Sequence, residues 1–311
     1  MTCSLQSRNK SGDKPLTKIQ TMTTREVVYH HSILRTFNGS VQKQIEPGFQ
    51  FAEGGQVALM DDMLMFRAML QHAGVPVAVN YDLRVENGII QETTDNCGMD
   101  GYAIIRCPRA ELSAEDVIRK IALALRGTFN ADKITVVPDP HPANWCFDES
   151  GNIRYIDYQP ARFLKDSVHL VGFPQPVGEE YEWSARRYYS KLGIFRMLRF
   201  NVMRAGGICL GEVLNKIIRA EYSADLVREI EGGMEKLLVY RVQAGQLSLR
   251  DALAKCDAWR VDDIREIALS VTESEDLLNQ VLKLTRGDFN LSLEIRHARA
   301  LEACDLILSI P

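Results

Sequence analysis

The chain of 311 residues contains no run of 18 or more apolar residues, so we expect no membrane-spanning helix. It also has little excess of either charge, because 37 Lys and Arg stand against 41 Asp and Glu, giving a formal net charge of −4. A dedicated nucleic-acid-binding protein usually has a basic surplus, so we expect no nucleic-acid partner. With 46% hydrophobic and 25% charged residues, the composition is that of a globular protein rather than a disordered one.

Paired cysteines at metal-binding or redox spacing are missing as well. The seven cysteines are scattered, and none belongs to a Cys-x-x-Cys pair, which argues against a disulfide framework and a structural zinc site. The expected location is therefore a reducing one, the cytoplasm. Residues 1–16 lack the apolar segment of a secretory signal and predict a disordered tail.

The first third of the chain contains short strand-like runs. Residues 25–37 and 40–46 flank Asn38-Gly39, a strong hairpin signal, and a further strand is possible at 17–23. Residues 54–74 predict a helix from their Met, Leu and Ala content and the glycines at both ends. Two more strand-like runs follow at 75–85 and 88–94. These patterns predict an N-terminal β-rich lobe over 17–95.

Beyond residue 110 the pattern is mainly helical. Ser113 and Asp116 form a capping-box pattern before an amphipathic run, and several amphipathic helices are expected from Tyr181 onward. The fold class predicted is α+β, with a small antiparallel β lobe carrying one helix, followed by a larger, mainly helical C-terminal lobe over 96–311.

One segment in this second part, 134–163, has the pattern of a chemical site. Residues 145–147 and 153–156 predict two short strands joined by a turn, and Asn144 and Asp157 lie at the two ends of this hairpin. The hairpin would bring Asn144 and Asp157 together, and their oxygens suit a hard cation such as Mg²⁺. Asp139, on the preceding loop, could then orient a hydroxyl nucleophile and accept its proton.

The order D-x-x-x-x-N, hairpin, I-D-Y resembles the active-site core of the protein-kinase-like superfamily. The sequence DPHPAN…IDY is similar to the motif DLHPGN…IDW of aminoglycoside and choline phosphotransferases and to the motif DPHPGN…IDFG of UbiB-type kinases. The stretch VVYHH resembles bacterial YrbL-type kinases. This resemblance implies a bilobal protein-kinase-like fold, ATP and Mg²⁺ as cofactors, and transfer of the γ-phosphoryl group to a hydroxyl.

The resemblance also implies roles for the motif residues. Asp139 would be the catalytic base or hydroxyl-orienting carboxylate, while Asn144 and Asp157 would bind the metal, with Asn144 also part of the catalytic loop. His141 would hold the loop together or be an ordinary loop histidine. Lys43, the only lysine between residues 25 and 110, would bind the α- and β-phosphates.

Two further roles are implied for the β-rich lobe. The acidic partner of Lys43 should lie on the following helix, where Asp62 has the expected spacing and Asp61 and Glu53 compete with it. The hinge that binds adenine through backbone groups should lie near the end of the last strand, at Gln91, Glu92, Thr93 and Thr94.

The sequence departs from the family pattern at several points. No GxGxxG precedes Lys43, so a phosphate-covering loop would have to lie around Met22–Arg25, and Val137 replaces the histidine of the HxD motif. Residues 158–183 contain no APE-like anchor, and the KxGQ signature of UbiB-type kinases is absent. A small-molecule acceptor is therefore favoured over a protein. The alternatives are a pseudokinase-like nucleotide-binding regulatory protein, an atypical protein kinase, or a helical interaction protein; the sequence indicates no oligomeric state.

Charged residues in the second lobe permit two interpretations each. The stretch 186–204 has six basic and no acidic residues and could form either an anion, partner or membrane-surface site or one solvated helix face. Glu179, Glu180 and Glu182 could contact a cationic substrate or lie on a solvated loop.

Overall fold

The computed structural model describes most of the chain beyond its N-terminal segment. The described stretches are 25–29, 32–37, 40–45, 55–129, 134–159, 161–170, 179–256, 261–285 and 291–310. The predicted tail at 1–16, the possible strand at 17–23, most of the expected phosphate-covering loop, and Glu53 lie outside these residues.

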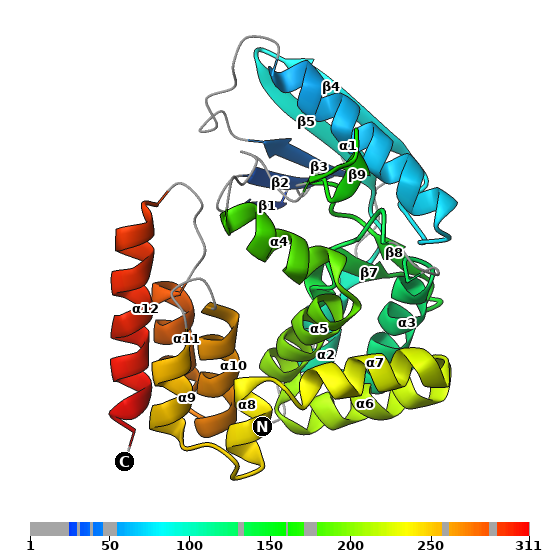
Figure 1. The fold of residues 1–311 in the computed structure, drawn as a ribbon. Helices are drawn as coiled ribbons and strands as arrows, with labels where there is room; N and C mark the ends of the chain where they lie inside the picture. The colour runs from blue at the N-terminus through cyan, green and yellow to red at the C-terminus, as the bar shows by residue number, and fades with distance from the viewer. Residues whose placement is uncertain are drawn as a thin grey trace, which may run out of the picture.

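A five-stranded antiparallel sheet forms the upper part of the molecule in Figure 1. The strands are β1 (Arg25–Tyr29), β2 (Ser32–Phe37), β3 (Ser40–Ile45), β4 (Tyr81–Glu86) and β5 (Ile89–Asp95), in the order β1-β2-β3-β5-β4. The predicted hairpin is confirmed by the pairing of β2 with β3, although its turn lies outside the described residues. The single run predicted over 25–37 is instead two paired strands, because one strand of that length would exceed the usual range.

Helix α1 (Gly55–His72) confirms the helix predicted over 54–74 and lies next to the β4–β5 pair (Figure 1). Its buried residues, Leu59, Met63, Phe66 and Leu70, recur at helical spacing and form one apolar stripe. The two strands after it are joined by Asn87 and Gly88, which both have positive φ, as a tight hairpin turn requires.

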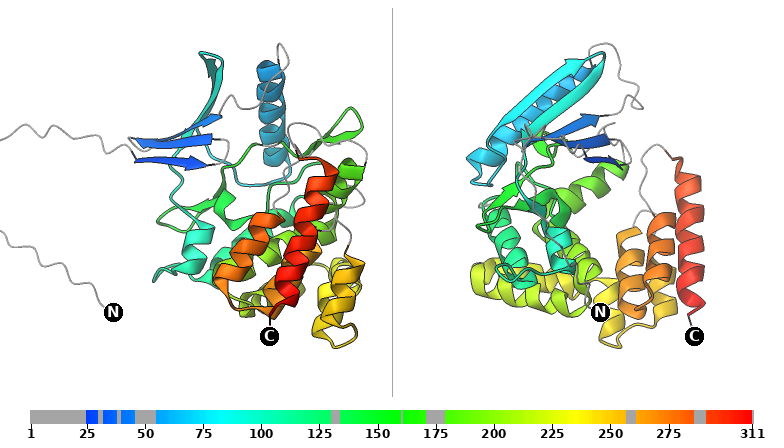
Figure 2. Two further views of the ribbon diagram at one scale, coloured as in Figure 1. Left: turned by 90° about the vertical axis from the view of Figure 1, so that its left-hand side faces the viewer. Right: turned by 180° about the vertical axis from the view of Figure 1, so that it is seen from behind.

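The remainder of the described chain is mainly helical, with two small antiparallel sheets (Figures 1 and 2). The strands and the 3-10 helix are β6 (Met99–Asp100), η1 (Pro142–Asn144), β7 (Trp145–Phe147), β8 (Ile153–Tyr155), β9 (Phe163–Lys165) and β10 (Val168–Leu170). The helices are α2 (Gly101–Arg106), α3 (Ala114–Arg126), α4 (Glu179–Tyr189), α5 (Lys191–Gly206), α6 (Cys209–Glu221), α7 (Ala224–Met234), α8 (Leu238–Gln243), α9 (Leu249–Lys255), α10 (Val261–Val271), α11 (Glu275–Leu284) and α12 (Leu293–Leu308). The predicted capping box at Ser113 and Asp116 is confirmed at the start of α3. The elements confirm the α+β class.

No helix within the described stretches combines the length and apolarity needed to cross a membrane.

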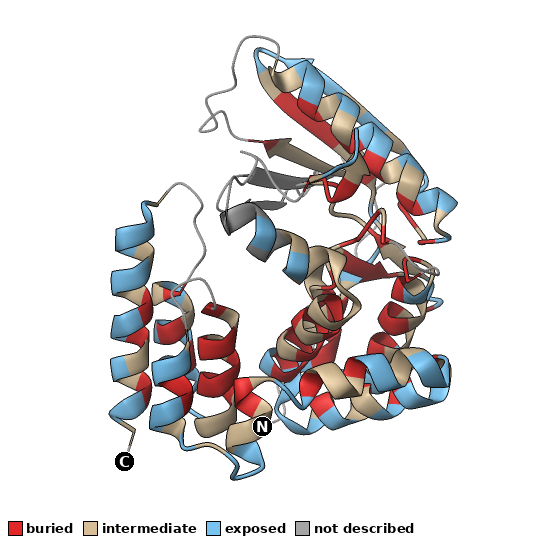
Figure 3. Ribbon diagram, in the orientation of Figure 1, coloured by how far each residue is buried: buried red, intermediate tan, exposed pale blue. Residues whose placement is uncertain are grey.

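Two apolar cores hold these elements, and their division differs from the predicted lobe boundary at residue 95. The first core joins Ile45 and Ile90 of the sheet to Trp145 of the second part and to Ile194 of α5. The second core is formed mainly by α8 to α12, which lie together at the lower left of Figure 3. The sheet and the first half of the helical part therefore share one core.

Gly98, in the connection that follows β5, provides a test of this packing. Its φ is +100°, and a Cβ at this position would lie 2.1 Å from the carbonyl oxygen of Phe147 in β7. We predict that Gly98→Ala lowers the free energy of unfolding by roughly 2 kcal/mol or more, because the backbone is strained and the neighbouring strand must move. Denaturant unfolding measures the change.

Gly74→Ala is the matched control, since Gly74 also has positive φ but a Cβ added there would meet no atom within 4 Å. It should lose only the conformational part, about 1 kcal/mol. Equal losses in the two variants would contradict the packing described here.

Candidate active site

The predicted hairpin over 145–156 is confirmed. β7 and β8 pair antiparallel, with Trp145 opposite Tyr155, and the turn between them is closed by hydrogen bonds to Asp148. The Ile156 N–H donates to the Asn144 carbonyl oxygen at 3.1 Å. Because this bond links the entrance of the hairpin to its exit, Asn144 and Asp157 lie at the same end, as the sequence predicts.

The loop before the hairpin is fixed by hydrogen bonds to buried aromatic residues. The Asp139 N–H donates to the Tyr155 hydroxyl at 2.9 Å, and Trp145 Nε1 donates to the Asp139 carbonyl oxygen at 3.1 Å. The Trp145 and Tyr155 side chains are fully buried. The backbone of Asp139 is therefore anchored to the rigid hairpin on both sides of its Cα atom.

The carboxylate of Asp139 is held by Arg162. Arg162 Nη2 lies 3.1 Å from Asp139 Oδ2, and only 5% of the Arg162 side chain is exposed. The His141 N–H also donates to Asp139 Oδ1, at 2.9 Å. Burial is the largest influence and would raise the pKa of Asp139, but Arg162, His141 and Arg187 together outweigh it, and the net direction is downward. Asp139 is therefore a carboxylate at neutral pH.

His141 stabilises the same loop. Its Nδ1 accepts a hydrogen bond from the Ala143 N–H at 3.1 Å, and its ring stacks on Tyr102 with centroids 5.5 Å apart. Burial lowers the pKa of His141, so the imidazole is neutral at neutral pH. These contacts favour the loop-holding role over a catalytic one.

Lys43 meets the hairpin across 114 residues of sequence. Its Nζ donates to Asp157 Oδ1 at 2.9 Å, and each of the two side chains is 19% exposed. Burial alone would lower the pKa of Lys43, but the carboxylates of Asp157 and Glu92 raise it above its ordinary value. Lys43 is therefore an ammonium ion, and it is bonded to Asp157, one of the two expected metal ligands.

Asp62 does not pair with Lys43. It forms an ion pair with Lys165 of β9 instead, so the predicted partnership is wrong in this structure. The spacing rule failed because α1 directs Asp62 toward β9 rather than toward β3. The second carboxylate near Lys43 comes from Glu92, which lies directly opposite it in the β3–β5 register.

The predicted hinge also needs correction. Glu92, Thr93 and Thr94 lie inside β5, which pairs with β3 on one side and β4 on the other. Their backbone groups are bonded within the sheet and do not fit the adenine-binding role. The chain leaves the sheet only after Asp95, so a hinge would lie at 96–98.

Glu92 is the functional candidate whose side chain the sequence analysis missed. It is 2% exposed, and neither carboxylate oxygen has a hydrogen-bond partner. Burial raises the pKa of Glu92 to about 7, with Asp157 adding to the rise and Lys43 opposing it. The available signal was a glutamate in the middle of β5, where Asp95 at the strand end is the one other charged residue.

Asn144 and Asp157 suit an oxygen-coordinated cation. Within the described residues, the Asn144 side-chain amide makes no hydrogen bond, and the only side chain bonded to Asp157 is that of Lys43. Across the described residues, no group of three or more His, Cys, Asp or Glu side chains forms a metal cage. The donor set fits Mg²⁺ held by one or two side chains with further oxygens from a phosphate ligand.

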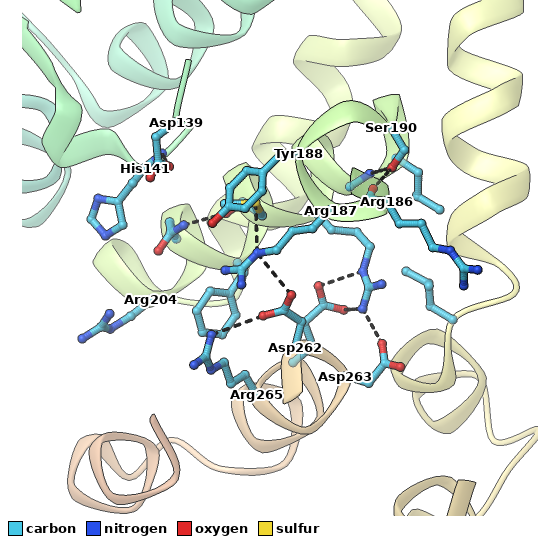
Figure 4. Close-up of a pocket in the computed structure, with 18 of the residues that line it drawn as sticks. Asp139, His141, Arg186, Arg187, Tyr188, Ser190, Arg204, Asp262, Asp263 and Arg265 are labelled. Carbon is cyan, nitrogen blue, oxygen red and sulfur yellow. Dashed lines mark hydrogen bonds and ion pairs between the residues drawn. The ribbon is translucent and has the colours of Figure 1, made fainter. Parts of the chain in front are cut away.

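A cavity of about 1090 Å³ opens next to Asp139 and His141 (Figure 4). Its walls come mainly from α4, α5, α10 and α11. The basic stretch 186–204 forms much of the wall and is not one solvated face, because Arg199 is 4% exposed and Arg196 is ion-paired with Asp263 and Glu266. Glu182 also lines the cavity, where it pairs with Arg186; the side chains of Glu179 and Glu180 lie outside the described residues.

No protein-family model matches this chain, and no curated protein matches it. The interpretation of the site therefore depends on the motif and on the geometry above.

Glu92 provides a test by pH. Its folded-state pKa of about 7 exceeds the ordinary value of 4.5, so between these values the folded protein holds a proton that the unfolded chain has lost. Its contribution to stability is complete below the ordinary pKa and is lost as the pH rises through the folded one. When the pH rises from about 5 to about 8, we predict that the free energy of unfolding falls by about 1–3 kcal/mol more in the wild type than in Glu92→Gln.

Urea unfolding of the Mg²⁺-free and nucleotide-free protein measures this difference. Glu302→Gln, at an exposed glutamate of α12, is the control and should keep the pH dependence of the wild type. Parallel pH profiles for wild type and Glu92→Gln would show that Glu92 is ionised throughout and that the assignment is wrong.

Proposed function

We propose that the protein is an ATP- and Mg²⁺-dependent phosphotransferase of protein-kinase-like fold, moving the γ-phosphoryl group to a hydroxyl of a small molecule. One observation carries the proposal: Lys43 of the sheet meets Asp157 of the hairpin, next to Asn144 and the anchored loop of Asp139. These are the residue types that the motif implied, and they come from three separate stretches of sequence.

Phosphoryl transfer needs positioning and charge neutralisation more than covalent chemistry from the protein. Bound Mg²⁺-ATP would supply the transferable group and its counter-charge. Lys43, kept charged by its two acidic neighbours, would bind phosphate oxygens, while Asn144 and Asp157 would hold the metal. The site is preorganised because these groups are attached to paired strands.

Asp139 would orient the acceptor hydroxyl. Its pKa is below the ordinary value because of Arg162, which makes it a weak base and a fixed hydrogen-bond acceptor. A loose transition state needs the hydroxyl aligned early and deprotonated late, so a weak base in a rigid position suits this role.

The cavity beside Asp139 supports a small-molecule acceptor. It is bounded by helices and has the size of a ligand pocket rather than of an extended peptide groove. A protein acceptor and a regulatory, non-catalytic nucleotide-binding role are the alternatives that the experiment separates.

The first measurement is ATP turnover with Mg²⁺ in wild type and Asp139→Asn. We predict a loss of about 100-fold or more in turnover, because the hydroxyl-orienting carboxylate is gone. Nucleotide binding is measured as the rise in melting temperature that Mg²⁺-ATP produces. This rise should persist in Asp139→Asn and be lost in Lys43→Met. Asp305→Asn, at an exposed aspartate of α12, is the matched control and should behave as wild type.

Asp139→Asn leaves the buried Arg162 without its counter-ion, so unfolding of each variant is measured first. Nucleotide binding without turnover in the wild type would favour the regulatory alternative. Unchanged turnover in Asp139→Asn, or no stabilisation of the wild type by Mg²⁺-ATP, would overturn the proposed function.

A further inference from the structure

We infer that the acceptor carries a negatively charged group, a phosphate or a carboxylate, and that Arg204 in the cavity beside Asp139 binds it. This inference rests on the proposed function, and it names the class of acceptor. Its basis is which charged groups of the cavity wall already have partners within the protein and which do not.

The acidic side chains of the cavity are already matched. Asp262 lies 3.3 Å from Arg187 and 3.2 Å from Arg265, so one carboxylate is shared by two guanidinium groups. Asp263 and Glu266 both bond to Arg196. A cationic acceptor would therefore have to displace an existing ion pair.

The remaining two acids of the wall are matched as well. Asp139 bonds to Arg162 at 3.1 Å, and Glu182 lies 3.5 Å from Arg186 in an exposed pair. Among the described residues of its wall, the cavity therefore presents no unpaired carboxylate to a cation.

Two cations of the wall stand without such partners. Arg204, near the C-terminal end of α5, and Lys283 of α11 make no hydrogen bond or ion pair within the described part of the chain. Both are exposed to the solvent that fills the cavity. Within the described part of the chain, no side chain neutralises these two cations, which leaves them open to a ligand or to counter-ions from solution.

Arg204 occupies the position that matters for chemistry. Figure 4 shows it between His141 of the catalytic loop and Arg265 of α10, with its guanidinium group free of dashed contacts. Burial is the main cause that lowers the pKa of His141 and brings that of Arg265 to about 10, and the nearby charge of Arg204 makes a smaller contribution in the same direction to both. The positive charge of Arg204 thus acts on the same space that Asp139 faces.

An anionic group on the acceptor would relieve the repulsion between Arg204 and Arg265. Guanidinium groups bind phosphates and carboxylates through paired, charge-assisted hydrogen bonds, which fix orientation as well as affinity. With its charged end held at Arg204, the acceptor would direct its hydroxyl toward Asp139, in the same cavity. Arg204 is therefore a specificity residue for the acceptor.

The test uses four small hydroxyl compounds that differ in charge: glycerol 3-phosphate, glycerate, glycerol and choline. Their binding to the full, nucleotide-free chain is measured by calorimetric titration. We expect glycerol 3-phosphate and glycerate to bind, and glycerol and choline not to bind. Arg204→Gln should raise the dissociation constants of the two anions about tenfold or more. The phosphate and carboxylate compounds separate the two sources of negative charge.

Arg250→Gln is the matched control, because Arg250 is an exposed helical arginine of α9 outside the cavity. It should leave anion binding unchanged. Lys43→Met should also retain it, which separates the cavity from the expected phosphate site at Lys43. Anion binding that is lost in Lys43→Met but kept in Arg204→Gln would overturn the inference, as would the absence of binding by both anions.

Binding of Mg²⁺-ATP to the same samples separates this inference from the proposed function. If Mg²⁺-ATP binds and the anions do not, the inference fails while the proposed function stands. If the anions bind through Arg204 and Mg²⁺-ATP does not bind, the proposed function fails and the cavity remains an anion site. Preferential binding of choline would overturn the assignment of charge.

Discussion

The ion pair between Lys43 and Asp157 is the contact on which the candidate site depends. It joins residues 114 positions apart, and neither side chain is more than 19% exposed. The pair forms because its two backbones lie on one core: Ile45, two residues after Lys43, and Tyr155, two residues before Asp157, are both buried in it. Loss of either partner would leave a largely buried charge unmatched, which is far more costly than breaking a surface ion pair.

Two carboxylates of the candidate site, one half-buried and one buried, show how the surroundings assign different states to the same chemical group. Arg162 lowers the pKa of Asp139, whereas Glu92 has no hydrogen-bond partner and burial raises its pKa to about 7. Asp139 is therefore a permanent anion, while Glu92 can gain or lose a proton near neutral pH. The negative charge of Glu92, opposite Lys43, therefore changes near neutral pH, whereas that of Asp139 does not.

The parts of this arrangement that the sequence predicted are those determined by local patterns. The hairpin at 145–155, α1, the capping box at Ser113 and the strand pair joined by Asn87-Gly88 all depend on neighbouring residues. The predicted proximity of Asn144 and Asp157 is likewise correct, because a hairpin brings its own two ends together.

The parts that failed depend on contacts between distant elements. Whether Asp62 faces β3 or β9 depends on the rotation of α1 in the core, which no spacing along the chain contains. The partnership of Lys43 with Glu92 depends on the register of β3 and β5, and α1 and β4 separate these strands in sequence. The hydrophobic pattern located the strands but not their order.

The cavity beside Asp139 is held in shape by ion pairs as well as by apolar packing, in which Phe200 and Met203 of α5 join the second core. Its two main walls, α5 and α10, belong largely to different cores, and between them run the ion pairs of Arg196 with Asp263 and Glu266. The guanidinium groups of Arg162 and Arg187 both lie over the Tyr188 ring, at 4.3 and 5.3 Å from its centroid. The same Arg162 holds the carboxylate of Asp139, so the loop of Asp139 and the cavity wall share one charged network.

Such a network tolerates one spacing between the helices, because a buried ion pair is favourable only when its geometry is complete. An apolar interface can slide or repack after a small change, whereas a guanidinium group that loses its carboxylate is left unpaired in a poorly solvated site. The network that keeps Asp139 ionised also links the loop of Asp139 to α4 and α10. Under the proposed function, the position of an acceptor and the charge of the group that would orient it would therefore have a common physical cause.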